Sequence, residues 1–275
     1  MYRKFILVCF VMAAASDAWA WGQEGHSIIA EIAQHRVAST TLDRIGKLLS
    51  AESGSSAVSL ASIASWADDY KFEEAGKNTS SLHFVNIPDD QASYDQVRDC
   101  SKGCTVGAID QYRTTLANCS ASPDDRRLAL KMLVHLVGDI HQPLHATDRT
   151  DAYTRKDDRG GNDVPVTFFG KPSNLHEVWD TGIIMRTVFA WGSYVTRLET
   201  SWFPGRDLTS MTGGSTADWA NESHKFAHDV AYDAPDDGTL GVRYFSKASP
   251  VVDRQLAVAG VRLARILDQA MASCP

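Results

Sequence analysis

Three histidines and one aspartate fall within the stretch HLVGDIHQPLH, which runs from His135 to His145. The stretch is otherwise largely apolar, and burying unpaired titratable groups costs several kcal/mol. On a helix, positions i and i+4 share a face, so His135 and Asp139 project together. Pro143 should end or kink the helix, which leaves His145 to be placed by the following turn. Imidazole and carboxylate are ligands that Zn²⁺ prefers, so a bound metal would compensate for the burial.

The same residue types recur at three other places in the chain. They are His176 and Asp180 in NLHEVWD, Asp68 in SWADD with His83 in LHFVNIP, and Trp21 with His26 in WGQEGH. A single His/Asp pair is more often a hydrogen bond within a core than a metal site. Several such sets in one chain, with an extra histidine after a proline, favour a zinc centre.

The first twenty residues have the features of a secretory signal peptide. Two basic residues, Arg3 and Lys4, precede an apolar run of about eleven residues, and the segment ends in the small-x-small pattern Ala18-x-Ala20. We expect a signal peptide at 1–20, cleavage before Trp21 and a mature domain at 21–275. The alternative is an uncleaved anchor, but the run is short for a membrane span. The mature chain is therefore expected to be secreted or periplasmic, without a membrane segment.

Cysteine usage agrees with an oxidising compartment. Four cysteines follow the expected cleavage site: Cys100, Cys104, Cys119 and Cys274. An even number outside the cytosol indicates disulfides, for which three connectivities are possible, and free buried thiols are less typical. We favour Cys100–Cys104 as a tight loop and Cys119–Cys274 as a fastening of the C-terminal helix. The long loop of the second bridge would contribute about 4–5 kcal/mol in the chain-entropy model.

The net charge is acidic. It is −7 for the whole chain and becomes −8 when Arg3, Lys4 and Asp17 leave with the first twenty residues. The sequence contains no lysine- or arginine-rich block, so it shows no general basic surface for nucleic acids. If the substrate is anionic, something other than side-chain cations must attract it.

Helical periodicity dominates the elements that must position these residues. We expect helices at 24–37, 40–50, 57–70, 105–118, 124–142, 174–200, 215–232 and 250–272. Pro123, followed by two aspartates, is a good start for the helix that leads to His135. The clear strand signal is VPVTFFG at 164–170, after the turn DDRGGND. The pattern predicts a mainly α single domain with a small β element.

In order and spacing, the motifs resemble those of the S1/P1-type nucleases, zinc-dependent single-strand nucleases with a phospholipase C/nuclease-like fold. The motifs are WGQEGH, SWADDYK, HFVNIP, RDC…C…GAI, HLVGDIHQPLH, GGNDVPVTFFG and NLHEVWD. They cover most of residues 21–180, and the remainder matches weakly, mainly through WANESHKFA. The resemblance implies a helical single-domain nuclease at 21–275.

The resemblance also implies three zinc ions per chain. The implied ligands are Asp68, His83 and His135 for one ion, His26 and Trp21 for a second, and His145, His176 and Asp180 for the third, with Asp139 bridging the first two. Trp21 would bind through its free α-amine and its carbonyl oxygen, closing a five-membered chelate. An α-amine has a pKa near 8 and is readily deprotonated by a metal. Cleavage before Trp21 would create this ligand.

Further roles follow from matching positions. Asp68 and Asp139 are implied as catalytic carboxylates, and Lys71 stands where the family often has arginine on the scissile phosphate. Lys71 would make a single phosphate contact rather than a bidentate one. Phe84 and Asn86 stand where some members stack and hydrogen-bond a base, and Asn86 replaces a commoner aspartate. Asn162 is assigned to the substrate side, where it fixes the loop of Gly160 and Gly161.

The implied activity is endonucleolytic hydrolysis of single-stranded DNA and RNA to 5′-phosphorylated products, with 3′-nucleotidase activity on nucleotides. We expect a monomer without an obligate protein partner. A zinc-dependent phospholipase C is the alternative enzyme, although its last motif usually has glutamate where Asp180 stands. A zinc-binding protein without turnover would need closed coordination shells. His141, His224 and His228 lack ligand motifs and are expected to pack around the site or lie at the surface.

Overall fold

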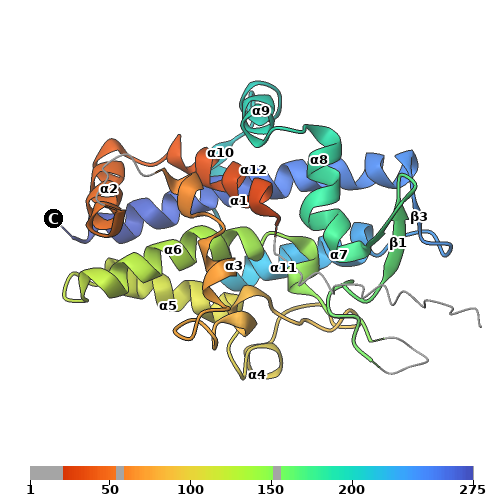
Figure 1. Cartoon of the computed structure of the whole chain (residues 1–275), viewed down its shortest axis with the longest axis horizontal. Coiled ribbons are helices and arrows are strands. Elements are labelled where there is room, and N and C mark those ends of the chain that lie inside the picture. Colours follow the sequence, from red (N-terminus) through yellow and green to blue (C-terminus); the bar gives the residue numbers. More distant parts are fainter. Residues whose placement is uncertain (1–20, 54–58, 151–155, 275) are drawn as a thin grey trace, which may run out of the picture.

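The computed structural model describes residues 21–53, 59–150 and 156–274 of the chain. These residues form a mainly helical domain with one small three-stranded sheet, as Figure 1 shows. The predicted fold class, mainly α with a small β element, is confirmed. The expected signal peptide lies outside the described residues.

The helices and strands follow one another in the order of their labels in Figure 1. The α-helices are α1 (Gln23–Gln34), α2 (Ser39–Ser53), α3 (Trp66–Tyr70), α4 (Gln96–Asp99), α5 (Thr105–Ala117), α6 (Pro123–Asp139), α7 (Leu175–Glu177), α8 (Ile183–Thr187), α9 (Trp191–Arg197), α10 (Leu208–Met211), α11 (Thr216–Phe226) and α12 (Val242–Ala272). Short 3₁₀ turns are η1 (Leu60–Ile63), η2 (Ser80–His83) and η3 (Pro143–Ala146). Wider π turns are η4 (Val178–Gly182), η5 (Leu198–Trp202) and η6 (Ala227–Ala231). The strands are β1 (Pro165–Phe168), β2 (Lys171–Asn174) and β3 (Thr239–Leu240).

Two helix pairs form the core. The long helix α12 extends along the molecule in Figure 1 and packs against α1, while α5 lies beside α6. The contact between α1 and α12 requires a glycine, because a Cβ atom on Gly260 would lie 2.4 Å from Cγ2 of Ile32. The backbones of the two helices therefore approach closely along buried, apolar faces.

Helix α6 carries the central motif into this core. Its start is as expected: Ser122 is the N-cap, its hydroxyl accepts from the N–H of Asp125, and Pro123 occupies the first turn. Every residue from Ala129 to Asp139 is buried. The helix ends at Asp139, earlier than the expected 142, because the next N–H groups turn back to nearer carbonyls and Pro143 has none to donate.

The prediction of one continuous helix at 57–70 is wrong. The described part consists of η1 and α3, with Ser65 between them in a non-helical conformation. The carbonyl oxygen of Ala64, at the break, accepts a hydrogen bond from Nδ1 of His135 on α6. A tertiary contact to a site residue therefore takes the place of a longer helix.

The single helix expected at 174–200 is also wrong. The helical structure in this segment begins after β2, where the side chain of Asn174 caps α7 by accepting a hydrogen bond from the N–H of Glu177. It continues through the wide turn η4 into α8 and is interrupted at Val188 and Ala190, whose backbones are extended. The wide turn holds Asp180, so the irregular geometry coincides with a candidate ligand.

The C-terminal helix and the sheet extend the expected elements. Helix α12 begins at Val242 rather than at 250 and contains Pro250 in its interior. Strand β1 lies within the expected 164–170, pairs antiparallel with β2 and parallel with β3, and gives the order β2-β1-β3. None of the helices in the described ranges is both long and apolar enough to cross a membrane.

Both expected disulfides are present. Cys100 is bonded to Cys104 just before α5, and Cys119 is bonded to Cys274. The second bridge ties the turn between α5 and α6 to the end of α12. The favoured connectivity is therefore confirmed, and the two helix pairs of the core are linked covalently.

Candidate metal centre

Three groups of buried histidine and aspartate side chains converge in the core. We call them the Asp68 group (Asp68, His83, His135), the His26 group (His26, His135, Asp139) and the His145 group (His145, His176, Asp180). Within each group, one potential ligand atom per residue lies within 4.8 Å of the others. Apart from Trp21, the expected ligands are thus brought together from segments far apart in the chain.

Asp139 lies between two of these groups. Its Oδ2 atom is 3.1 Å from Nδ1 of His83 and 3.2 Å from Nε2 of His135, while its Oδ1 atom is 3.3 Å from Nε2 of His26. On the other side of the Asp68 group, Oδ1 of Asp68 is 3.6 Å from Nε2 of His135. The two oxygens of Asp139 therefore face different histidines, which is the arrangement that a bridging carboxylate requires.

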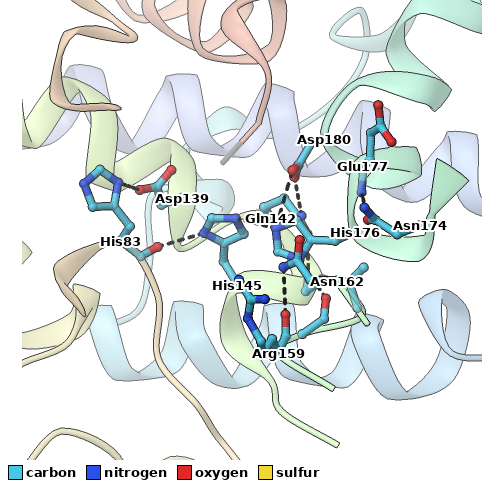
Figure 2. Close-up of polar contacts among 12 residues, drawn as sticks. His83, Asp139, Gln142, His145, Arg159, Asn162, Asn174, His176, Glu177 and Asp180 are labelled. Carbon is cyan, nitrogen blue, oxygen red and sulfur yellow. Dashed lines mark hydrogen bonds and ion pairs between the residues drawn. The ribbon is translucent and has the colours of Figure 1, made fainter. Parts of the chain in front are cut away.

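The His145 group shows why a cation fits. Nδ1 of His145 and Nδ1 of His176 lie 2.8 and 2.7 Å from the carbonyl oxygens of His83 and Gly160, as Figure 2 shows in part. A carbonyl only accepts, so both Nδ1 atoms carry hydrogen and both Nε2 atoms present lone pairs. The two Nε2 atoms are 3.0 Å apart, and Oδ2 of Asp180 is 3.4 Å from Nε2 of His176. A divalent cation relieves this repulsion.

The Asp68 group and the His26 group also contain atoms that a cation would pair. Among the described residues, buried polar atoms without a hydrogen-bond partner include both carboxylate oxygens of Asp139, Nε2 of His83 and both ring nitrogens of His26. Native proteins rarely leave such atoms unpaired. The donor set of imidazole and carboxylate is the one that Zn²⁺ takes. The residues present therefore fit metal ions.

The pKa values of the histidines and aspartates in the three groups depend strongly on burial and on one another. Burial and the neighbouring His135 lower the pKa of His26 to about 4, and burial with His145 lowers the pKa of His176 to about 3. Burial alone would lower the pKa of His135, but Asp139 and Asp68 outweigh it and raise the pKa to about 9. Burial holds the pKa of Asp180 well above its usual range. A divalent cation would replace the proton of His135 and favour the charged carboxylates.

Gln142 supports the His145 group and was not identified from the sequence. Its side chain is fully buried, its Nε2 atom donates to Oδ1 of Asp180 at 2.6 Å, and its Oε1 atom accepts from the N–H of Leu144 at 2.6 Å. One amide thus fixes the carboxylate of Asp180 and the turn that carries His145. Its position inside HLVGDIHQPLH was the available signal.

Gln142→Met is expected to weaken metal binding at the His145 group about 10- to 100-fold, because the carboxylate of Asp180 loses the donor that orients it. Metal content per chain, measured after dialysis against graded chelator, tests this. Gln255→Met is the matched control: Gln255 is equally buried and donates to the carbonyl oxygen of His141, but contacts no ligand. Equal metal loss in both variants would show that Gln142 acts only through folding.

The start of the described chain is held against the same centre. The side chain of Trp21 is fully buried, and the N–H of Gly22 donates to the carbonyl oxygen of Asp180 at 3.0 Å. A Cβ atom on Gly138 would lie 2.7 Å from Nδ1 of His26, so α6 passes directly against this imidazole. The binding of metal by the amine and carbonyl of Trp21 stays a prediction.

Two further histidines are buried without joining the three groups. Nε2 of His141 accepts from Arg262 at 2.7 Å, and its Nδ1 donates to the carbonyl oxygen of Val137, so it packs behind the centre as expected. His224 is buried, with its ring nitrogens 3.0 and 2.9 Å from the carbonyl oxygens of Ala146 and Gln91. Of the two positions expected for His224, at the surface or around the site, the structure therefore shows the buried one, against the carbonyl oxygen of Ala146, the residue that follows His145.

A cleft of about 330 Å³ opens onto the metal centre. Its lining includes His83, His145 and His176 with Lys71, Phe72, Phe84, Asn86, Arg159 and Asn162. Nζ of Lys71 donates to Oδ1 of Asp68 at 2.8 Å, which places the cation beside the carboxylate. The exposed ring of Phe72 was not identified from the sequence, since nothing in its spacing distinguishes it.

Phe84 and Asn86 reach the cleft because the chain there is extended. Burial alternates along the segment: His83, Val85 and Ile87 are buried, whereas Phe84 and Asn86 are exposed. The N–H of Val85 donates to the carbonyl oxygen of His145 at 2.8 Å, which fixes the register. The two expected base-contacting residues therefore lie on one face, next to the buried candidate ligand His83.

The loop 158–162 also lines the cleft, through Arg159, Gly160 and Asn162. Arg159, Gly160 and Gly161 all have positive φ, of 55°, 59° and 82°. Glycine adopts this region freely, but for an L-residue such as Arg159 it costs roughly 1–2 kcal/mol. The side chain of Asn162 donates to the carbonyl oxygen of Arg159 at 2.8 Å, so Asn162 fixes the loop as expected. The carbonyl oxygen of Gly160 in turn holds His176.

Comparisons with known proteins show which proteins this chain is similar to. A family model described as S1/P1 Nuclease matches residues 21–272. The chain is 32% identical to Nuclease S1 of Aspergillus oryzae, covering 98% of each chain. It is 32% identical to Nuclease P1 of Penicillium citrinum, covering 90% of this chain and 97% of that one. It is 34% identical to Endonuclease 2 of Arabidopsis thaliana, covering 96% of this chain and 95% of that one.

Proposed function

This chain belongs to the S1/P1 nuclease family, and on that premise we propose that it is a zinc-dependent endonuclease for single-stranded DNA and RNA. It is a nuclease, a hydrolase of phosphoric ester bonds. The proposal adds that its products carry 5′-phosphates and that it also removes the phosphate of nucleoside 3′-phosphates.

The observation that carries the proposal is the convergence of three buried His/Asp groups on one cleft that is flanked by Phe84 and Asn86. When bound there, zinc ions would supply Lewis-acid polarisation of the phosphate and lower the pKa of water to about 7. Positive ions at one cleft would also explain how an acidic protein attracts a polyanion.

In the proposed ligand assignment there are three zinc ions per chain. Asp68, His83 and His135 would hold one, His26 and the amine and carbonyl of Trp21 would hold the second, and His145, His176 and Asp180 would hold the third, with Asp139 shared by the first two. The spacing of Asp139 between His26 and His83 supports the shared role. The hydrogen bonds from His145 and His176 to carbonyl oxygens support their binding through Nε2.

The side chains at the cleft have separate tasks in this proposal. Asp68 orients the attacking water by accepting its hydrogen bond, and Lys71 remains beside that carboxylate, from where its ammonium reaches an oxygen of the scissile phosphate. Phosphoryl transfer needs mainly positioning and charge stabilisation, which these groups provide. Gln142 and Gly160 orient Asp180 and His176.

The preference for single strands follows from the shape of the cleft and its aromatic edge. A volume of about 330 Å³ admits roughly one nucleotide. Phe84 offers an exposed ring, and Asn86 on the same face offers an amide for the base edge. A base can stack on Phe84 only after leaving its own stack, which a duplex resists. Base preference is set by Asn86 in this proposal.

The site of action proposed is outside the cytoplasm, in the secreted or periplasmic fraction. Two disulfides support this because such bonds persist in oxidising compartments. The protein is proposed to act as a monomer, since each of the three groups is assembled within one chain.

The purified protein is expected to hydrolyse single-stranded DNA and RNA at least about tenfold faster than duplex DNA of the same sequence, because pairing withholds the base from Phe84. Initial rates are compared for the three nucleic acids, a nucleoside 3′-phosphate and phosphatidylcholine, with chelated protein as the blank. Hydrolysis of phosphatidylcholine alone would favour the alternative, a phospholipase C. Equal rates on single strands and duplex would contradict the role given to the cleft.

A further inference from the structure

Arg159 places a second cation at the cleft, on a different segment of the chain from Lys71 and Phe84. Its side chain lines the same cavity, and Figure 2 shows Arg159 near His145 and Asn162. The side chain is 67% exposed, and Nη1 lies 3.7 Å from Oδ1 of Asp163, which is itself exposed. Such a long, solvated ion pair contributes little, so the guanidinium is accessible to a ligand.

The backbone holds this arginine in a conformation that another residue would adopt at less cost. Its φ of 55° suits glycine or asparagine better. The conformation is nevertheless fixed, because the N–H of Arg159 donates to Oδ1 of Asp148 at 3.1 Å and its carbonyl oxygen accepts from Asn162. Strain held by surrounding bonds is common at ligand-binding positions. An arginine at this place therefore indicates a role for its charged group.

The geometry of a bound nucleotide indicates which group Arg159 meets. The cavity admits roughly one nucleotide. If the 3′-phosphate binds at the His/Asp groups and the base at Phe84 and Asn86, the polar end of the nucleoside that remains is its 5′-oxygen. In a polynucleotide that oxygen carries the preceding phosphate. A planar guanidinium is well suited to bind such a phosphate through two parallel hydrogen bonds.

We propose that Arg159 binds the phosphate on the 5′ side of the nucleoside in the cleft, so that the enzyme prefers substrates carrying this second phosphate. The inference rests on the proposed function, which it deepens by naming a specificity-determining residue. It explains how one cleft distinguishes a chain, or a nucleotide phosphorylated at both ends, from a simple nucleoside 3′-phosphate.

The test compares kcat/KM for a nucleoside 3′,5′-bisphosphate with that for the corresponding 3′-monophosphate. The native enzyme is expected to prefer the bisphosphate roughly tenfold, a typical value for one charge-assisted phosphate contact. Arg159→Asn suits the left-handed backbone and should remove most of this preference, with a much smaller change for the monophosphate. Arg159→Lys should retain part of it. The native preference should also fall as ionic strength rises.

Arg206→Ala is the matched control. It removes the same charge at an exposed position where the guanidinium lies over the ring of Trp202, and Arg206 does not line the cleft. The melting temperature provides a second readout: Arg159→Asn should match or exceed the native value, because the left-handed strain is relieved. A preference lost together with a lower melting temperature would indicate a structural role for Arg159 and overturn the inference.

Two other results would overturn the inference while leaving the proposed function intact. One is a native enzyme that hydrolyses both nucleotides without preference. The other is an Arg159→Asn variant that keeps the full preference. If the native enzyme hydrolyses neither these nucleotides nor single-stranded DNA, the proposed function itself fails, and the inference fails with it.

Discussion

Asp139→Asn is expected to lower kcat/KM for single-stranded DNA on the order of 10³-fold or more and to reduce the metal content of the protein. The substitution preserves the shape of the side chain, so packing in the core is little disturbed. It replaces one of two oxygens that face His26 on one side and His83 and His135 on the other. An amide nitrogen cannot serve as a ligand, so the proposed bridge is broken.

The large size of the effect follows from the surroundings of Asp139. The side chain is fully buried, and although burial acts to raise its pKa, the imidazoles of His135, His26 and His83 hold it well below the usual range. The carboxylate is therefore the negative charge around which the first two groups are arranged. Removing that charge would affect two of the proposed metal sites at once, whereas losing a terminal ligand would affect one.

Lys71→Ala is the control, with an expected loss of about 10²-fold, as for removal of one group that stabilises a developing charge. Lys71 contacts Asp68 and lines the cleft, but it is not a metal ligand, so the variant should keep its full metal content. Both variants are measured for kcat/KM and for metal by elemental analysis. Comparable losses, with full metal content in Asp139→Asn, would show that Asp139 is not the bridge.

A chain produced in the cytoplasm with a methionine retained before Trp21 is expected to lose one metal ion and to hydrolyse single-stranded DNA on the order of 10²-fold more slowly. A free α-amine, with a pKa of about 8, can bind a metal together with its own carbonyl oxygen. When another residue precedes Trp21, that nitrogen belongs to an amide. An amide is a far poorer ligand and cannot close the same chelate.

The structure makes this variant informative, because the fold around Trp21 does not depend on the amine. The indole is buried, and Gly22 is bonded to Asp180 through the peptide N–H that follows Trp21. The retained methionine should therefore change metal content and rate more than the far-ultraviolet circular dichroism. Mass spectrometry identifies the N-terminus of each preparation. Equal zinc content and equal rates in the two forms would disprove the ligand role of Trp21.

The predictions from sequence were most successful where a short spacing carries the information. The i, i+4 pairs His135/Asp139 and His176/Asp180 each share one face, and each pair lies within one of the three groups. The favoured cysteine pairing was confirmed, as was the turn at Gly160 and Gly161, whose φ values are positive. Residue type and local backbone geometry suffice for these features, because each involves only a few consecutive peptide units.

Predictions of long helices were less successful because other segments compete for their backbone groups. The helix expected at 57–70 is broken where Ala64 gives its carbonyl oxygen to His135. The helix expected at 174–200 contains the wide turn that carries Asp180. The carbonyl oxygen of Asp180 accepts a hydrogen bond from the N–H of Gly22, which lies at the start of the described chain. The hydrophobic periodicity of a segment reflects that segment alone. It does not predict hydrogen bonds between its backbone and residues from another part of the chain.

The sequence by itself indicated the residue types of the candidate metal groups, the helix faces on which they lie, the favoured disulfide pairs and the resemblance to the family. Only the tertiary structure decided that Gln142 orients Asp180, that Gly138 admits His26, and that Arg159 and Phe72 line the cleft beside Phe84. The physical reason is the range of the interactions. Spacing along a helix or turn is set by neighbouring peptide units, whereas the meeting of two remote side chains depends on how the whole core packs.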